Sequence, residues 1–214
     1  MEQIICKALE FVKQVFEAEY SGHDYFHTYR VFRTATRIAE AEGAEVELVQ
    51  LAALLHDVDD GKLSPHTYEN KDKARAFLQE QGVEKGRIEK ICHIIDQVSF
   101  RGTESVTPDS LEGRCVQDAD RLDAIGAIGI ARTFAYGGNR NRPMYDPEIP
   151  PKTDMTAEEY RKHVSPTLNH FYEKLFFLKE LMTTQTAKAM AEERDSYMRD
   201  FVDRFLREWD GMID

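Results

Sequence analysis

The hydrophobic pattern of this chain has the period of an α-helix along nearly its whole length, without the sustained alternation of a half-buried strand. Helices are expected over about 2–20, 25–41, 45–57, 71–81, 84–98, 110–136, 157–182 and 184–209. A chain of 214 residues buries one core and does not require a second. We therefore predict an all-α fold, with residues 1–214 forming a single helical bundle.

The segment 137–156, GGNRNRPMYDPEIPPKTDMT, interrupts this pattern, because it contains four prolines and has no helical period. A loop of that length inside a compact domain is usually functional or mobile. We expect this Gly/Pro loop to be mobile in the empty protein and to order over a bound substrate. The remaining chain, 157–209, is predicted to form two amphipathic helices.

The charge and cysteine content exclude several classes of protein. A formal net charge of -11 argues against a basic surface for duplex nucleic acid, but a bound cation with a few arginines still allows an anionic small molecule. Three scattered cysteines without a CxxC pair argue against disulfides and zinc–thiolate sites. The N-terminal segment does not resemble a signal peptide, and no apolar run reaches the roughly 18 residues of a membrane span. We expect a cytoplasmic protein with no membrane partner; the pattern does not indicate its oligomeric state.

The stretch LLHDVDD at 54–60 places a histidine and three aspartates in five consecutive positions at the end of an apolar helix. Burying unpaired charge costs several kcal/mol, so such groups require partners or a metal ion. His23 and His27 lie four positions apart on one face of the preceding helix. Asp118 and Asp120 lie in another apolar helix further along the chain. Histidines and carboxylates on facing helices of a bundle are a common way to hold a divalent metal.

The order of His27, the doublet His56–Asp57 and Asp120 resembles the H…HD…D pattern of the HD-domain metal-dependent phosphohydrolases, with core motifs over 23–125. Further segments are similar to a bacterial subgroup of small stand-alone HD hydrolases: SGHDYFHTYRV, LAALLHDVDDGK, DADRLDAIGAIGIARTF and GGNRNRPMYDP. The resemblance implies a helical bundle around a metal whose ligands are those four residues. Two imidazoles and two carboxylates suit Mn, Fe, Co, Ni or Zn better than Ca or Mg; we expect Mn, with Mg still open.

The resemblance also implies an activity, the hydrolysis of phosphate esters or anhydrides by attack of a metal-activated water on phosphorus. Some similar proteins are nucleoside triphosphate pyrophosphohydrolases, so a nucleotide is the expected substrate. Asp60 matches a catalytic acidic position of related enzymes. His23 either faces the substrate in a catalytic role or makes a hydrogen bond at the helix start. Asp118 is expected to orient a ligand histidine.

The remaining substrate contacts are predicted from charge and from position near the Gly/Pro loop. Four cations are candidates for holding phosphate, and one tyrosine is a candidate for stacking on a base: Lys62, Arg140, Arg142, Lys174 and Tyr145. The two arginines are equally compatible with a solvated loop.

Two other groups are expected to have structural roles. Asp123 is expected to pair with Arg121 or Arg132. His93, in an apolar helix, is expected to be a satisfied core histidine, with a place in the lining of the pocket as the alternative.

Two alternative functions accompany the leading one. A 5′-nucleotidase or phosphomonoesterase would release orthophosphate instead of pyrophosphate. A non-catalytic metal-stabilised nucleotide-binding module would bind without turnover, but it would not need an acid such as Asp60 beside an open metal position. The segment ADRLD weakly resembles alarmone hydrolases, but no other part of the sequence supports that function.

Overall fold

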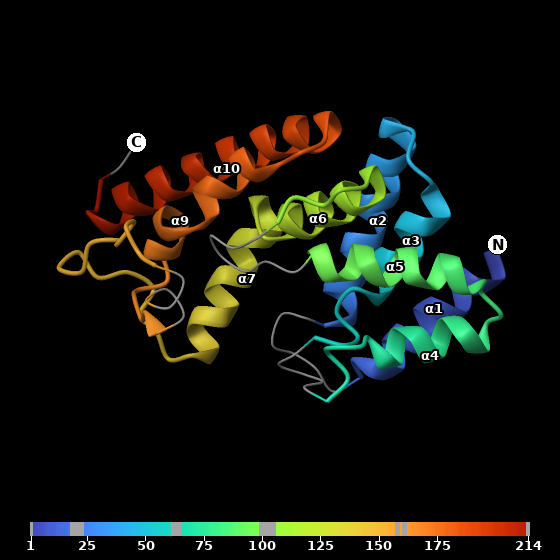
Figure 1. Cartoon of the computed structure of the whole chain (residues 1–214). Helices are drawn as coiled ribbons and strands as arrows, with labels where there is room; N and C mark the ends of the chain where they lie inside the picture. Colours follow the sequence, from blue (N-terminus) through green and yellow to red (C-terminus); the bar gives the residue numbers. More distant parts are fainter. Residues whose placement is uncertain are drawn as a thin grey trace. The chain divides into compact units, whose positions relative to one another are not determined.

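The computed structural model describes residues 2–17, 24–60, 66–98, 106–156, 159 and 162–212, and all regular elements within these ranges are helices (Figure 1). The prediction of an all-α fold is confirmed. No helix in the described ranges is long and apolar enough to cross a membrane. The chain forms two compact units, Met1–Asp120 and Arg121–Asp214. Whether residues 1–214 act as one domain stays a prediction.

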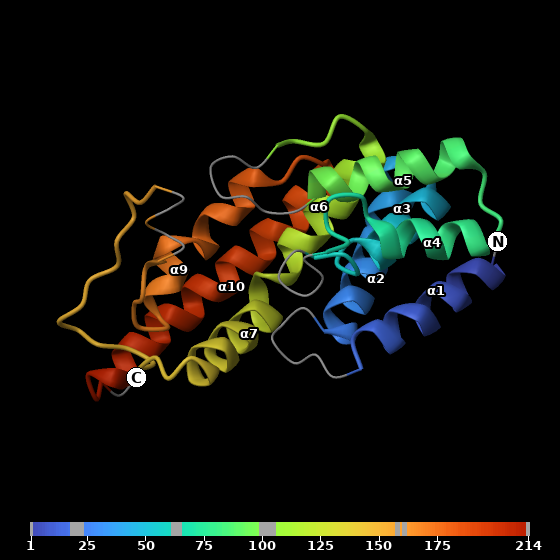
Figure 2. The same cartoon turned by 60° about the horizontal axis from the view of Figure 1, so that its bottom comes forward.

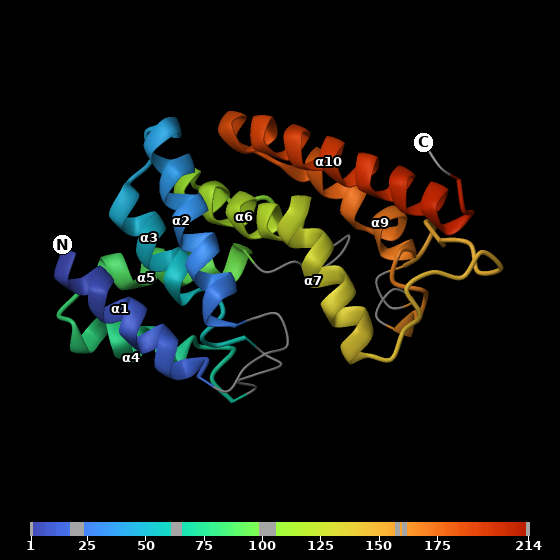
Figure 3. The ribbon, with the colours of Figure 1, turned by 180° about the vertical axis from the view of Figure 1, so that it is seen from behind.

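The first unit is built around helix α3. Its elements are α1 (Glu2–Val15), α2 (Tyr25–Glu42), α3 (Val46–Leu55), α4 (Asp72–Glu80), α5 (Lys85–Val98) and most of α6 (Leu111–Asp123). Helix α3 packs against α1, α2 and α5, and α4 packs against α5, as Figure 3 shows from behind. Over its last five residues, 51–55, helix α3 is wholly apolar and fully buried, which is typical of a helix segment with neighbours all round. Its C-terminal end is therefore held inside the core.

Helix α2 has a side-chain cap at its start and a glycine at its end. The carboxylate of Asp24 accepts a hydrogen bond of 2.7 Å from the backbone N–H of His27. Gly43 adopts a left-handed φ of 74° and returns its N–H to the carbonyl of Ala39. Asp24 is thus the N-cap of α2, and His27 is fixed in the first turn.

The second unit consists of α7 (Gly126–Asn139), α9 (Asn169–Glu173), the 3-10 helix η2 (Leu175–Leu181) and α10 (Gln185–Trp209). Helices α7 and α10 lie side by side in Figure 2, and α10 also packs against η2. The buried Phe171 and the half-buried Phe134, Phe201 and Phe205 form an aromatic cluster, with contacting ring centroids 5.9–6.2 Å apart. Aromatic packing thus adds to the aliphatic core of this unit.

The prediction of one helix over 110–136 is wrong, because α6 ends at Asp123 and α7 starts at Gly126. Gly126 has a φ of 76°, and an added Cβ would lie 2.9 Å from the side chain of Arg194. The residues at the break are apolar, so the hydrophobic period runs through it. Helix α7 then continues to Asn139, three residues into the predicted loop. Within it, Gly137 leaves space for the side chain of Thr167, which a Cβ at this position would meet.

The prediction of a continuous helix over 157–182 is also wrong. Residues 163–166 are not helical, α9 has five residues, and η2 is a 3-10 helix. The backbone N–H groups of Thr167 and Leu168 donate to the carbonyls of Pro143 and Met144, both at 2.9 Å. Loop contacts thus replace the helical hydrogen bonds, a tertiary effect that the local pattern does not show. The mobility expected of the loop stays a prediction.

Candidate metal centre

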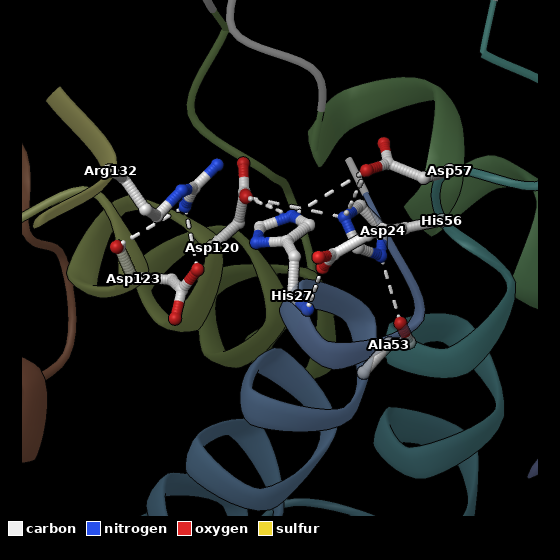
Figure 4. Close-up of polar contacts among 8 residues, drawn as sticks. All are labelled: Asp24, His27, Ala53, His56, Asp57, Asp120, Asp123 and Arg132. Carbon is white, nitrogen blue, oxygen red and sulfur yellow. Dashed lines mark hydrogen bonds and ion pairs between the residues drawn. The ribbon is translucent and has the colours of Figure 1, made fainter. Parts of the chain in front are cut away.

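The first unit brings the imidazoles of His27 and His56 together, with ring centroids 5.5 Å apart (Figure 4). Oδ2 of Asp57 lies 3.5 Å from Nε2 of His27 and 3.3 Å from Nε2 of His56. Oδ1 of Asp120 lies 3.4 Å and 4.0 Å from the same two nitrogens. His27, His56 and Asp57 offer ligand atoms that all lie within 4.8 Å of one another. Four residues from three separate parts of the sequence therefore gather at one point.

This cluster is buried except at one member. His27, His56 and Asp57 are 1%, 6% and 7% exposed, whereas the side chain of Asp120 is 24% exposed. The end of α3 directs His56 and Asp57 inward, the first turn of α2 supplies His27, and α6 supplies Asp120. In Figure 4 the carboxylates of Asp57 and Asp120 approach the rings from two sides. Asp120 is the member that connects the cluster to solvent.

The tautomer of His56 follows from its neighbour. Its Nδ1 lies 2.8 Å from the backbone carbonyl oxygen of Ala53. Because a carbonyl can only accept, Nδ1 carries the proton, and in the neutral ring Nε2 holds a lone pair. That Nε2 is buried and makes no hydrogen bond with any residue that the structure describes. A lone pair facing two carboxylates is repulsive, and a cation between them removes the repulsion, so the donor set fits a divalent ion.

The charges of the cluster act on one another. Burial by itself lowers the pKa of His56, but the carboxylates of Asp57 and Asp120 outweigh it, and the pKa is raised from its ordinary value. Burial opposes the ionisation of Asp120, yet the hydrogen bond and charge of His27, with the charge of His56, lower the pKa of Asp120. Without an ion, the cluster favours a proton on the imidazole of His56. A bound metal would replace that proton.

The sequence interpretation missed the role of Asp59. Its side chain is buried, and its two oxygens accept hydrogen bonds from the backbone N–H groups of Lys73, at 3.2 Å, and Ala74, at 3.0 Å. These groups belong to the first turn of α4, whose own N-cap residue, Lys71, supplies no side-chain hydrogen bond. Asp59 therefore caps α4 from a distance. The lack of a capping side chain at position 71 was the only signal in the sequence.

Asp60 lies one turn beyond Asp57, as predicted. Helix α3 ends at Leu55, two residues earlier than expected, and the chain continues in a turn in which the N–H of Asp60 donates to the carbonyl of Asp57 at 3.0 Å. Asp60 is partly exposed, while the neighbouring Asp59 is buried. The catalytic role of Asp60 stays a prediction.

The other predicted groups on α6 differ in outcome. Asp118 is fully buried. It stands two positions before Asp120, and residues two apart on a helix do not face each other. The predicted role of Asp118 in orienting a ligand histidine stays a prediction. Asp123 pairs with Arg132, with 2.6 Å between Oδ2 and Nη1, which confirms one of its two expected partners.

Four of the predicted substrate-binding residues belong to the second unit. Tyr145 packs edge-on against Trp209 and Phe205, at centroid distances of 5.2 and 6.2 Å. Arg140 and Arg142 lie over the ring of Tyr136, and Lys174 follows α9. His23 and Lys62 lie outside the described residues. The roles of all six in substrate binding or catalysis stay predictions.

The prediction that His93 is a core histidine is wrong. Its side chain is 56% exposed, and its Nε2 lies 2.8 Å from Oδ2 of Asp109. The buried side of α5 carries Ile88, Ile91, Cys92, Ile94, Ile95 and Val98. This apolar face is wide but does not include position 93, so the surrounding hydrophobicity was misleading.

Comparisons with known proteins agree with this geometry. The family model of the HD domain matches residues 24–125. An uncharacterised Bacillus subtilis protein, YpgQ, is 37% identical over 94% of this chain and 92% of its own length. The crystal structure of an HD-superfamily hydrolase from Bacillus thuringiensis superposes with a TM-score of 0.79 and 44% identity, covering 98% of each chain. The crystal structure of YpgQ in complex with ADP superposes with a TM-score of 0.73 and 34% identity, over 94% of this chain and 96% of that one.

Proposed function

This chain belongs to the HD domain family, and on that basis we propose that it is a metal-dependent phosphohydrolase that acts on a nucleotide. The observation that carries the proposal is the buried Nε2 of His56, which faces carboxylate oxygens of Asp57 and Asp120. His27, His56, Asp57 and Asp120 would hold the ion, and manganese is the metal that we propose. When bound, the ion supplies a Lewis acid that neutralises phosphoryl charge and acidifies water.

The residues of the chain then have separate tasks. The carbonyl of Ala53 fixes the ring of His56, so that its Nε2 stays directed into the cluster. The part-exposed Asp120 marks the side from which a substrate phosphate enters. Asp60, partly exposed and one turn beyond Asp57, accepts the proton of the attacking water. An in-line hydrolysis requires mainly such positioning and charge neutralisation.

The substrate class is supported by a relative. The structure of YpgQ contains ADP, and its sequence aligns with most of this chain. A nucleoside polyphosphate offers the phosphate oxygens that an ion at the cluster would contact. We propose a nucleoside triphosphate that is cleaved to the monophosphate and pyrophosphate.

The test combines metal analysis with a nucleotide panel. The purified chain, loaded in turn with Mn, Mg, Co, Ni and Zn, is assayed on nucleoside mono-, di- and triphosphates with separate detection of pyrophosphate and orthophosphate. Asp60→Ala should keep the metal and lose about a hundredfold or more in kcat, whereas Asp57→Ala should lose both metal and turnover. Asp109→Ala, which removes an exposed acid of the same unit, is the matched control and should keep both.

The outcomes separate the competing functions. Pyrophosphate release from triphosphates supports the proposal, and orthophosphate from monophosphates identifies a 5′-nucleotidase instead. Metal and nucleotide binding without turnover under any of these conditions would leave only a binding module.

A further inference from the structure

The end of helix α7 gathers positive charges on the surface of the second unit. The guanidinium carbons of Arg140 and Arg142 lie 5.4 and 5.6 Å from the centre of the Tyr136 ring. Within the described part of the chain, neither arginine has a carboxylate within ion-pair distance, although the net charge is -11. Two like charges over one ring repel each other, so an anion between or beside them would be stabilising.

The backbone fixes this pair of arginines. After α7, the N–H of Arg140 donates to the carbonyl of Tyr136 at 3.0 Å, and the N–H of Arg142 donates back to the carbonyl of Gly137 at 2.9 Å. Asn141, between them, has a left-handed φ of 54°, which is uncommon for a residue other than glycine. The chain thus folds back on the last turn of the helix. Both arginines return to the same tyrosine because of this reversal.

Lys174, the residue that follows α9, is a further cation of this unit. Burial lowers the pKa of His170 to about 3, and the positive charges of Lys174 and Arg142 add to the effect. His170 is therefore a neutral imidazole at physiological pH, and two cations are close enough to influence it. Arg142 belongs both to the arginine pair over Tyr136 and to the pair of cations that act on His170. The cations of α7 and α9 accordingly converge on one region of the second unit.

We propose that Arg140 and Arg142, over Tyr136, together with Lys174 at the end of α9, form a binding site for a phosphoryl or pyrophosphoryl anion that requires no metal. Guanidinium groups bind phosphate oxygens through pairs of parallel N–H donors, and the half-exposed Tyr136 ring supports their planes. The partial negative charge at the end of α7 stabilises one cation but does not explain three together. The site depends only on contacts within the second unit and does not require the proposed hydrolase function.

The anion has two chemical sources, a phosphate of a bound nucleotide or free inorganic phosphate and pyrophosphate. Both present the same oxygens to the arginines. The experiment therefore begins with the inorganic anions and then adds the nucleotide arm.

The test measures pyrophosphate and inorganic phosphate binding to the full-length chain by calorimetry in excess EDTA. Arg140→Gln with Arg142→Gln should weaken pyrophosphate binding about tenfold or more. Arg204→Gln with Arg207→Gln removes the same charge from the exposed face of α10, where each arginine has an acid four positions away, and should change binding less than about twofold. Arg140→Lys with Arg142→Lys should restore part of the affinity. If the double glutamine variant does not fold, the two single variants provide the same comparison.

Absence of pyrophosphate binding by the wild-type chain in EDTA would overturn the proposal, and so would equal losses in the two double glutamine variants. In the metal-loaded protein, a raised KM for nucleotides in the Arg140 and Arg142 variants, with kcat nearly unchanged, identifies the substrate as the source of the anion. Pyrophosphate binding that nucleotides do not compete with identifies a free anion. Failure of the hydrolase assay alone leaves the EDTA result intact, so the two proposals fail separately.

Discussion

Two carboxylate–imidazole groups, one in each unit, contain the same kinds of side chain but differ in their hydrogen bonds. In the first unit, Asp57 faces the imidazoles of His27 and His56, and Nε2 of His56 makes no hydrogen bond among the described residues. In the second unit, the side chain of Glu173 is 2% exposed and accepts from Nε2 of His163 at 3.0 Å and Oγ of Ser165 at 2.9 Å. Its Oε1 also accepts from the backbone N–H of Lys152, at 3.2 Å.

The difference shows that a buried acid beside a histidine is not by itself a metal site. The partners of Glu173 all donate protons, so its charge is already compensated. A cation there would have to displace them. Around Asp57, Nδ1–H of His56 already donates to the Ala53 carbonyl, so in the neutral ring the lone pair of Nε2 faces carboxylate oxygens. The first group is suited to an ion, and the second ties the end of the Gly/Pro loop to α9.

The largest effect is expected for Asp57→Asn, which removes the charge of one proposed ligand. We expect kcat/KM to fall by about a thousandfold or more, equivalent to about 4 kcal/mol, with loss of stoichiometric metal. Metal at a hundred times its Kd should stabilise the wild-type chain by about 2.7 kcal/mol and the variant by much less. Elemental analysis and thermal unfolding measure these effects. The matched change Glu173→Gln should keep the metal; loss of metal there would contradict the comparison.

The next effect is expected on stability in the second unit. Glu173→Ala leaves three donors, two of them part-buried, without their acceptor and should destabilise the protein by about 3 kcal/mol. Urea unfolding measures the change. Metal content should be unaffected, because the first unit supplies all four proposed ligands. A Glu173→Ala variant as stable as the wild type would show that these hydrogen bonds contribute little.

The buried imidazole of His170, in the second unit, should make the protein less stable in acid. The pKa of His170 is about 3 in the folded protein against 6.5 in the unfolded chain, so the unfolded state binds the proton first as the pH falls. Stability associated with His170 is complete above pH 6.5 and decreases below it, by about 2 kcal/mol at pH 5. His170→Gln should remove that part of the slope in urea unfolding at several pH values. An unchanged slope would place the titrating group elsewhere.

The smallest effect is expected at Asp59. Asp59→Ala removes the remote cap of α4 and should cost about 1 kcal/mol of unfolding free energy. Because Asp59 also anchors the turn that carries Asp57 and Asp60, metal affinity should fall a few-fold, about 0.5–1 kcal/mol. Asp59→Asn, which keeps an acceptor oxygen, should show smaller losses. Isothermal titration with Mn and urea unfolding separate the two effects, and a large loss of metal with full stability would make Asp59 a ligand instead.

The helices were predictable where the local pattern decides. The periodicity placed α2 and α4 to within one residue at each end, and the residues that bound α2, Asp24 and the left-handed Gly43, act through local interactions. The break after Asp123 and the irregular segment before α9 were not predictable. Their causes are Arg194 against Gly126 and the loop carbonyls that take the N–H groups of Thr167 and Leu168. Those partners are remote in the sequence.

The sequence by itself determined that this chain is helical, because the hydrophobic period is a property of the chain alone, and its resemblance to the H…HD…D pattern named four candidate ligands, Asp57 among them. Only the tertiary structure decided what the other two crowded carboxylates do. Asp57 faces the histidines, while Asp59 accepts from the amides of α4 and Asp60 is partly exposed. The physical reason is that a buried carboxylate is defined by the donors around it, and these come from segments that only folding brings close.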